Sequence, residues 1–182
     1  VTTKFATVER ALFDLIKTVS VTATTSSEER KEQLAHFVVL MEELFRVDPT
    51  DGIIERMVPL ELFLEGSARY MEHYSALKTI YPTVDHDVTH GWADYIENIE
   101  PALVRHFLSI RVWYHVGSGA LYQLDQEGLD IATRIGSGET AYSVARDYLN
   151  LSDQQKAEIL AEIKSSDQWK TLEDKGKAMA EL

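Results

Sequence analysis

Apolar residues recur at steps of three and four along most of this chain, and no other feature constrains the fold as strongly. A period near 3.6 residues is typical of amphipathic helices that bury one face. Residues 2–20 show it first, and the next stretch repeats it with Leu34, Phe37, Val38, Met41, Leu44 and Phe45. No segment alternates apolar and polar residues between turn signals, so we find no convincing strand. The spacing predicts an all-α protein.

Capping and breaking residues divide this pattern into separate helices. Ser26 with Glu29, and Ser152 with Gln155, have the spacing of a capping box at a helix N-terminus. Glycine and proline indicate turns between the helices, with turns expected at 48–52 and 136–138 and a turn or a kink at 117–119. The helices expected between these signals cover residues 53–81, 86–99, 101–116, 120–135 and 139–149, in addition to those at either end of the chain.

This division predicts a single compact all-α domain of about eight helices, with orthogonal or bundle-like packing. The domain is expected to span residues 1–182, with 139–182 as a candidate C-terminal helical subregion. Two further helices carry apolar stripes that we expect to face the core. The stripe of the helix over 53–81 consists of Leu60, Phe63, Leu64, Ala68, Met71 and Leu77, and that of the last helix of Trp169, Leu172, Gly176 and Met179.

The charge of the chain argues against several classes of partner. Lys and Arg number 18 and Asp and Glu 30, which gives a net charge of −12, and each half of the chain carries 9 − 15 = −6. Nucleic-acid binding needs basic side chains that displace counterions from phosphates, and anionic membranes attract basic segments. We therefore expect neither as a partner. The chain has no cysteine, which excludes disulfides and thiolate zinc sites, and without a recognisable signal segment we expect a cytoplasmic location.

The centre of the chain combines histidine with acidic side chains. In a helix over 86–99, His86, His90 and Asp94 share one face at successive steps of four, and Asp87 follows His86 directly. Neutral imidazole and carboxylate suit Zn²⁺, Fe²⁺ or Mn²⁺. The pattern makes His86, Asp87, His90 and Asp94 candidate ligands of a divalent transition metal. The alternative is a solvated helix start, where acidic residues favourably oppose the helix dipole.

Two further histidines suggest a different cofactor. His106 and His115 lie in the most apolar of the expected helices, 101–116, close to Phe107 and Trp113. Haem in an all-α fold needs an axial histidine in an apolar pocket. His106 and His115 are therefore candidate tetrapyrrole ligands, although haem is less favoured than a metal ion. Histidines in such surroundings are more often core residues with one satisfied nitrogen.

Aromatic residues are concentrated in the same region. Nine of the 17 aromatic side chains lie between Phe63 and Tyr114. Tyrosine, tryptophan and arginine are the residues that most often anchor protein interfaces, and tyrosine and tryptophan combine an apolar body with a polar tip. The concentration indicates either an interaction surface or an aromatic core, and burial decides between them.

Residues 140–163 have the pattern of a helix-turn-helix element, with core positions at Val144, Ala145, Leu149 and Leu151. The second helix would begin Asp153-Gln154-Gln155-Lys156 and so offer a single cation. A helix that reads base edges normally lies among several basic residues near the phosphates. Two helices packed at a short turn is the simpler interpretation.

No catalytic frame is visible, because the chain has no cysteine and no Gly-x-Ser-x-Gly elbow. The first hypothesis is therefore a non-catalytic helical protein–protein interaction or assembly module that self-associates. The second is a metal-dependent enzyme, or a metal- or tetrapyrrole-binding protein, with its site within residues 73–115. The third is a transcriptional regulator that uses the element at 140–163.

Overall fold

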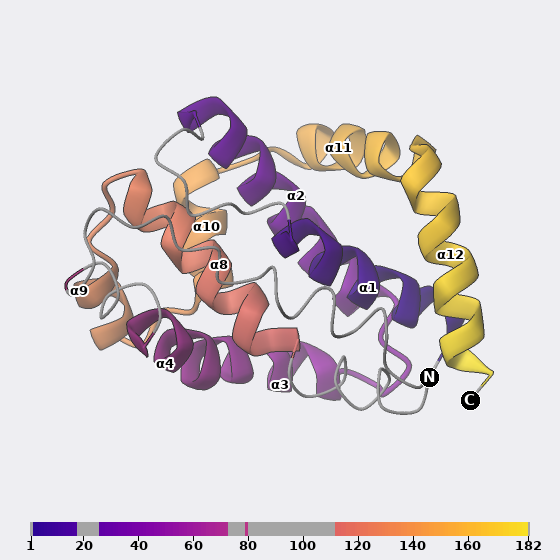
Figure 1. Ribbon diagram of the computed structural model, residues 1–182, viewed down its shortest axis with the longest axis horizontal. Coiled ribbons are helices and arrows are strands. Elements are labelled where there is room, and N and C mark those ends of the chain that lie inside the picture. Colours follow the sequence, from indigo (N-terminus) through magenta and orange to yellow (C-terminus); the bar gives the residue numbers. More distant parts are fainter. Residues whose placement is uncertain (1, 18–25, 73–78, 80–111, 182) are drawn as a thin grey trace.

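The computed structural model describes residues 2–17, 26–72, 79 and 112–181. All regular secondary structure in these segments is helical, which confirms the all-α prediction, and the helices form eight continuous runs within them (Figure 1). The elements are α1 (Thr3–Lys17), α2 (Ser27–Arg46), α3 (Ile53–Glu61), the π-helix η1 (Leu62–Gly66), α4 (Ser67–Tyr70), α8 (Val112–Gln126), α9 (Ile131–Gly136), α10 (Ala141–Leu149), α11 (Asp153–Ser165) and α12 (Asp167–Ala180).

Helix α2 is the central helix of the described fold. The predicted capping box forms at its start, where the Glu29 backbone N–H donates to Ser26 Oγ at 3.2 Å and the Ser26 N–H donates to Glu29 Oε2 at 2.8 Å. Helices α1, α8, α10 and α11 all pack against α2. The buried surface of α2 is therefore wider than the predicted stripe, and it includes Val39 and Leu40. A helix surrounded on several sides needs apolar residues beyond one face.

Helix α12 lies along α1 and brings the two ends of the chain together (Figure 1). Its predicted stripe is confirmed, since Trp169, Leu172, Gly176 and Met179 are all buried. The backbones approach closely at Gly176, where an added Cβ would lie 2.8 Å from the backbone nitrogen of Thr7. Only glycine allows this approach. Gly176 thus lets the backbone of α12 approach that of α1 closely.

The second close crossing joins η1 and α4 to α8. Residues 117–119 were expected to form a turn or a kink, and the turn is wrong, because these residues lie inside α8 and are buried. The glycine at 117 serves helix packing instead: a Cβ there would lie 2.9 Å from the Cα of Gly66. A small residue in a helix interior permits such an approach, at a cost in helix propensity.

The connections beyond α8 follow the predicted turn chemistry in part. The helix expected over 120–135 is interrupted after α8 by Gly128, which has a φ of +82°, and α9 begins after the capping residue Asp130. The expected turn at 136–138 is confirmed, with Gly138 at a φ of +90°. The Ser152–Gln155 capping box also forms. The helix expected over 86–99 lies outside the described residues, as does the helix over 101–116 up to residue 111.

Candidate functional site

Helices α3, η1 and α4 form one continuous run whose inner face meets the core. The buried positions in it are Val58, Leu62, Gly66 and Tyr70, each four residues after the last. In an α-helix, steps of four drift by about 40° around the axis. The π-helix from Leu62 to Gly66 winds more slowly, so steps of four stay on one face through it.

The predicted core stripe of this segment is wrong. Leu60, Leu64, Ala68 and Met71 are exposed, and Phe63 is only half-buried. Leu77 lies outside the described residues. The prediction assigned the face with more large apolar residues to the core, whereas the buried face carries Val58, Leu62, Gly66 and Tyr70.

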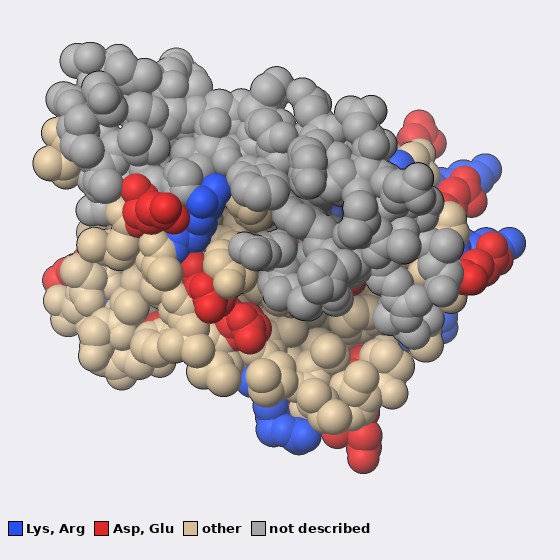
Figure 2. Space-filling view, turned by 60° about the horizontal axis from the view of Figure 1, so that its bottom comes forward, with Lys and Arg blue, Asp and Glu red and all other residues tan. Residues whose placement is uncertain are grey.

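The outward side of this run carries an apolar surface that we call the outer apolar face. It consists of five large side chains that are 44–55% exposed, namely Ile53, Met57, Leu60, Leu64 and Met71. Figure 2 brings this side of the molecule forward, and uncharged residues cover most of its described surface. Single exposed apolar residues are ordinary on a soluble protein, whereas a contiguous set indicates a binding surface.

The start of the outer apolar face is held by the loop before α3. Asp48 accepts hydrogen bonds from the backbone N–H groups of Thr50 at 2.7 Å and of Ile54 at 3.1 Å. Burial would raise the pKa of the Asp48 carboxyl, but these hydrogen bonds outweigh it and hold the pKa below its usual value. The carboxylate therefore stays ionised and fixes the entry to α3 at neutral pH.

The far end of the same run is anchored by Tyr70. Its side chain is buried, and burial raises its pKa first, followed by the charge of Asp125 and the hydrogen bond to it. A tyrosine that stays protonated donates its hydroxyl proton to the Asp125 carboxylate on α8. The helical run that carries the outer apolar face is therefore held at three places: by Asp48 at its start, by the close crossing at Gly66, and by Tyr70 at its end.

Most of the predicted cofactor residues lie outside the described part of the chain. These are the candidate metal ligands His86, Asp87, His90 and Asp94, and the candidate tetrapyrrole ligand His106. His115 is described, and it is 5% exposed in the core-facing part of α8. Among the described residues, no three His, Asp or Glu side chains are grouped so that they could hold a metal ion.

The aromatic residues divide between core and undescribed segments. Trp113 is 3% exposed and Tyr70 is 8% exposed, so both belong to the core rather than to an interaction surface. Tyr114 is half-buried, and Tyr74, Tyr81, Trp92 and Tyr95 lie outside the described residues. The exposed large apolar side chains of the described residues are aliphatic or sulfur-containing.

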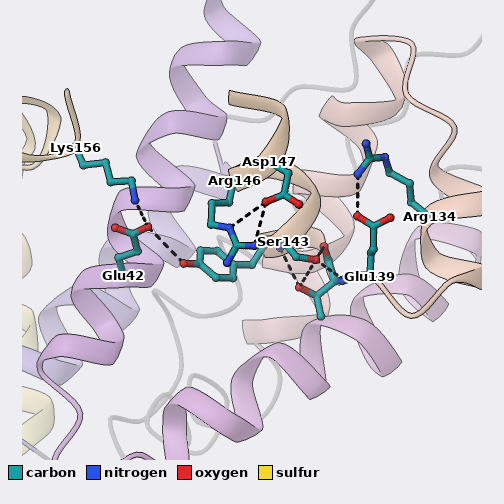
Figure 3. Close-up of polar contacts among 9 residues, drawn as sticks. Glu42, Arg134, Glu139, Ser143, Arg146, Asp147 and Lys156 are labelled. Atoms are coloured by element: carbon teal, nitrogen blue, oxygen red, sulfur yellow. Dashed lines mark hydrogen bonds and ion pairs between the residues drawn. The ribbon is translucent and has the colours of Figure 1, made fainter. Parts of the chain in front are cut away.

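The helix-turn-helix pattern at 140–163 corresponds to α10 and α11, which both pack against α2. Figure 3 shows that cations near these helices face acidic partners. Lys156 Nζ lies 2.7 Å from Glu42 Oε1, Arg146 Nη2 lies 3.0 Å from Asp147, and Arg134 Nη1 lies 2.8 Å from Glu139. The single cation at the start of the expected recognition helix, Lys156, is thus paired with α2.

Comparison with protein-family models, with curated proteins and with solved structures finds no match for this chain. Within the described segments, no helix combines the length and the apolar character that crossing a bilayer requires.

Proposed function

We propose that this protein is a non-catalytic helical interaction module that self-associates through the outer apolar face. The observation that carries the proposal is the set of five large apolar side chains, each about half exposed, on one rigid helical run. Covering them with a second apolar surface removes them from water, and this is the main favourable term in protein association. We also propose that the protein is located in the cytoplasm.

The spacing within the face favours a second helix as its partner. Ile53, Met57, Leu60 and Leu64 follow one another at steps of four, three and four. This is the alternation of the d and a positions along a coiled-coil seam, where helices pack knobs into holes. Met71 extends the apolar surface by about two further turns.

Two charged residues beside the seam favour a second copy of this same chain. Arg56 and Glu61 flank the apolar positions and are five residues apart, which is the g-to-e spacing of charge pairs across a parallel helix pair. Within the described part of the chain, neither side chain has an ion-pair partner. In a parallel dimer, Arg56 of each copy would face Glu61 of the other.

The size of the seam sets the expected strength of the dimer. The run from Ile53 to Tyr70 has 18 residues, or roughly 27 Å of helix. A single helix pair of this length covers less than the ~800 Å² per partner of a standard interface. We therefore expect a concentration-dependent dimer in the micromolar range.

Sedimentation velocity over a range of about 1–200 µM tests the proposal. The wild type should shift from monomer to dimer, and Leu60→Glu should remain a monomer throughout, because it places a charge in the seam. Ala178→Glu adds the same charge at an exposed position of α12 and should dimerise like the wild type. A wild type that stays monomeric over the whole range contradicts self-association.

Charge exchange tests the parallel arrangement separately. Arg56→Glu and Glu61→Arg should each weaken the dimer, because like charges then face each other across the seam. The double variant restores opposite charges and should recover most of the affinity. Double variants as weak as the single ones would show that these two side chains do not meet.

A further inference from the structure

A cavity of about 380 Å³ lies away from the outer apolar face, among α1, α2, α11 and α12. Its apolar wall is formed by Leu15, Leu40, Ile163, Trp169 and Leu172. The volume lies in the range of pockets that hold small organic molecules, which are typically apolar hollows with a few placed polar groups.

The polar groups at this cavity are acidic. Asp14, Glu29, Glu32 and Glu162 line it, and none of the lining residues in the described part of the chain is Lys or Arg. Asp14 is paired with Arg10 at 3.2 Å, and Glu29 belongs to the capping box of α2. Glu32 on α2 and Glu162 on α11 make no ion pair within the described residues.

His36 lines the same cavity and does not supply the missing positive charge. Burial lowers the pKa of its imidazole, and the charges of Glu32 and Glu162 only partly oppose that shift. The ring is therefore neutral at pH 7, where it offers one hydrogen-bond donor and one acceptor. No Lys or Arg side chain in the described wall of the cavity offsets the charge of Glu32 and Glu162.

The aromatic part of the wall is held in place by neighbouring polar groups. The Trp169 indole N–H donates to Glu173 Oε1 at 3.2 Å, and Lys164 Nζ lies 5.8 Å from the ring centroid. Lys164 also donates to Glu43 at 2.6 Å, which ties α11 to α2. Because these contacts already hold the side chains of the wall in place, a ligand that enters does not have to order them, and the loss of side-chain entropy on binding is smaller.

We propose that this cavity binds a small organic amine with an apolar body. The ammonium group lies between Glu32 and Glu162, and the apolar body packs against Trp169 and its aliphatic neighbours. Charge complementarity is the reason for assigning an amine to this cavity. The acidic side chains repel anions, and a neutral molecule gains only the contacts with the apolar wall. The site is independent of the proposed dimer seam.

Isothermal titration calorimetry with three matched probes tests the proposal at pH 7.5. Phenethylamine, 2-phenylethanol and phenylacetate share one apolar body and differ in charge. The amine should bind about tenfold more tightly than the alcohol, because the two exposed carboxylates of Glu32 and Glu162 contribute about two- to fivefold each. Phenylacetate should show no binding. Equal affinity for all three probes, or no binding of the amine, overturns the proposal.

Matched variants locate the ammonium group. Glu32→Gln and Glu162→Gln should each weaken amine binding by about two- to fivefold and leave the weaker alcohol binding unchanged. Glu158→Gln serves as the control, because Glu158 is an exposed residue on the same helix as Glu162 and does not line the cavity. Circular dichroism confirms that each variant is folded. If all three variants bind the amine like the wild type, the carboxylates of the cavity do not recognise it.

Discussion

Gly66 of η1 and Gly117 of α8 meet at a helix crossing so close that a Cβ on Gly66 would lie 2.9 Å from the Cα of Gly117. The three atoms nearest to such a Cβ all belong to the backbone of Gly117 and Ser118, and backbone atoms cannot rotate away as a side chain can. The contact therefore sets the distance between α8 and the run that carries the outer apolar face.

Replacing either glycine should destabilise the protein. Gly66→Ala or Gly117→Ala forces the helices apart, and we expect a cost of about 1–3 kcal/mol in the free energy of unfolding. Gly136→Ala is the matched control, because nothing lies within 4 Å of a Cβ there. Urea denaturation measures all three. Equal stabilities for the three variants would show that the crossing is not tight.

The register of the α3–η1–α4 run gives a second prediction. Leu62 is fully buried whereas Leu60 is 45% exposed. Leu62→Ala should therefore cost about 2–5 kcal/mol of stability, and Leu60→Ala should change stability by less than about 1 kcal/mol while weakening the dimer. Chemical denaturation at low protein concentration separates the two effects. The reverse order of stabilities would support the uniform 3.6-residue pattern.

Local signals in the sequence predicted much of this fold. The capping boxes of Ser26 and Ser152 depend on residues three positions apart, so the sequence contains all the information they need. The stripe of α12 also follows, because that helix is regular and meets the core on one side. The wide burial of α2 depends on the helices around it and could not be read from its own residues.

The outer apolar face and the cavity could not be predicted in the same way. The run over α3, η1 and α4 has apolar residues on two faces, and its own sequence does not show that Val58 and Leu62 are buried while Leu60 and Leu64 are exposed. The π-helix at Leu62–Gly66 also has no distinctive residue pattern. Gly117 resembles a turn residue until its partner Gly66 is known. The cavity brings Glu32 and Glu162 together from positions 130 residues apart, which only the tertiary fold specifies.

A buried acid gives a pH-dependent prediction. Glu9 is 4% exposed, and burial raises its pKa from 4.5 to about 8. The folded protein therefore holds a proton that the unfolded chain releases, so Glu9 contributes stability below pH 4.5 that is lost as pH rises to about 8. Glu9→Gln should reduce this loss, because an amide does not ionise.

The difference between wild type and Glu9→Gln is the quantity to measure. Denaturation at pH 5, 6.5 and 8 should show that the free energy of unfolding of the variant rises relative to that of the wild type as pH rises. Contributions from other titrating groups such as His36 cancel in this difference. A difference that stays constant across this range would show that Glu9 ionises normally.

The predicted metal ligands remain open to a direct test. If His86 and His90 bind a divalent ion, zinc, iron or manganese should raise the melting temperature at pH 7.5, since a ligand of the folded state stabilises it. Replacing both histidines with alanine should abolish that rise. An unchanged melting temperature of the wild type with all three metals would show that the pattern is only a solvated helix start.

Cysteine cross-linking tests self-association through the outer apolar face most directly. The chain has no cysteine, so Leu60→Cys introduces a single thiol at a d position of the seam, and Ala178→Cys introduces one at an exposed position of α12. Equivalent d residues face each other in a parallel helix pair, within reach of a disulfide. Under mild oxidation, L60C should form a covalent dimer much faster than A178C, at a rate that Leu64→Glu suppresses. Equal cross-linking of L60C and A178C would contradict the account.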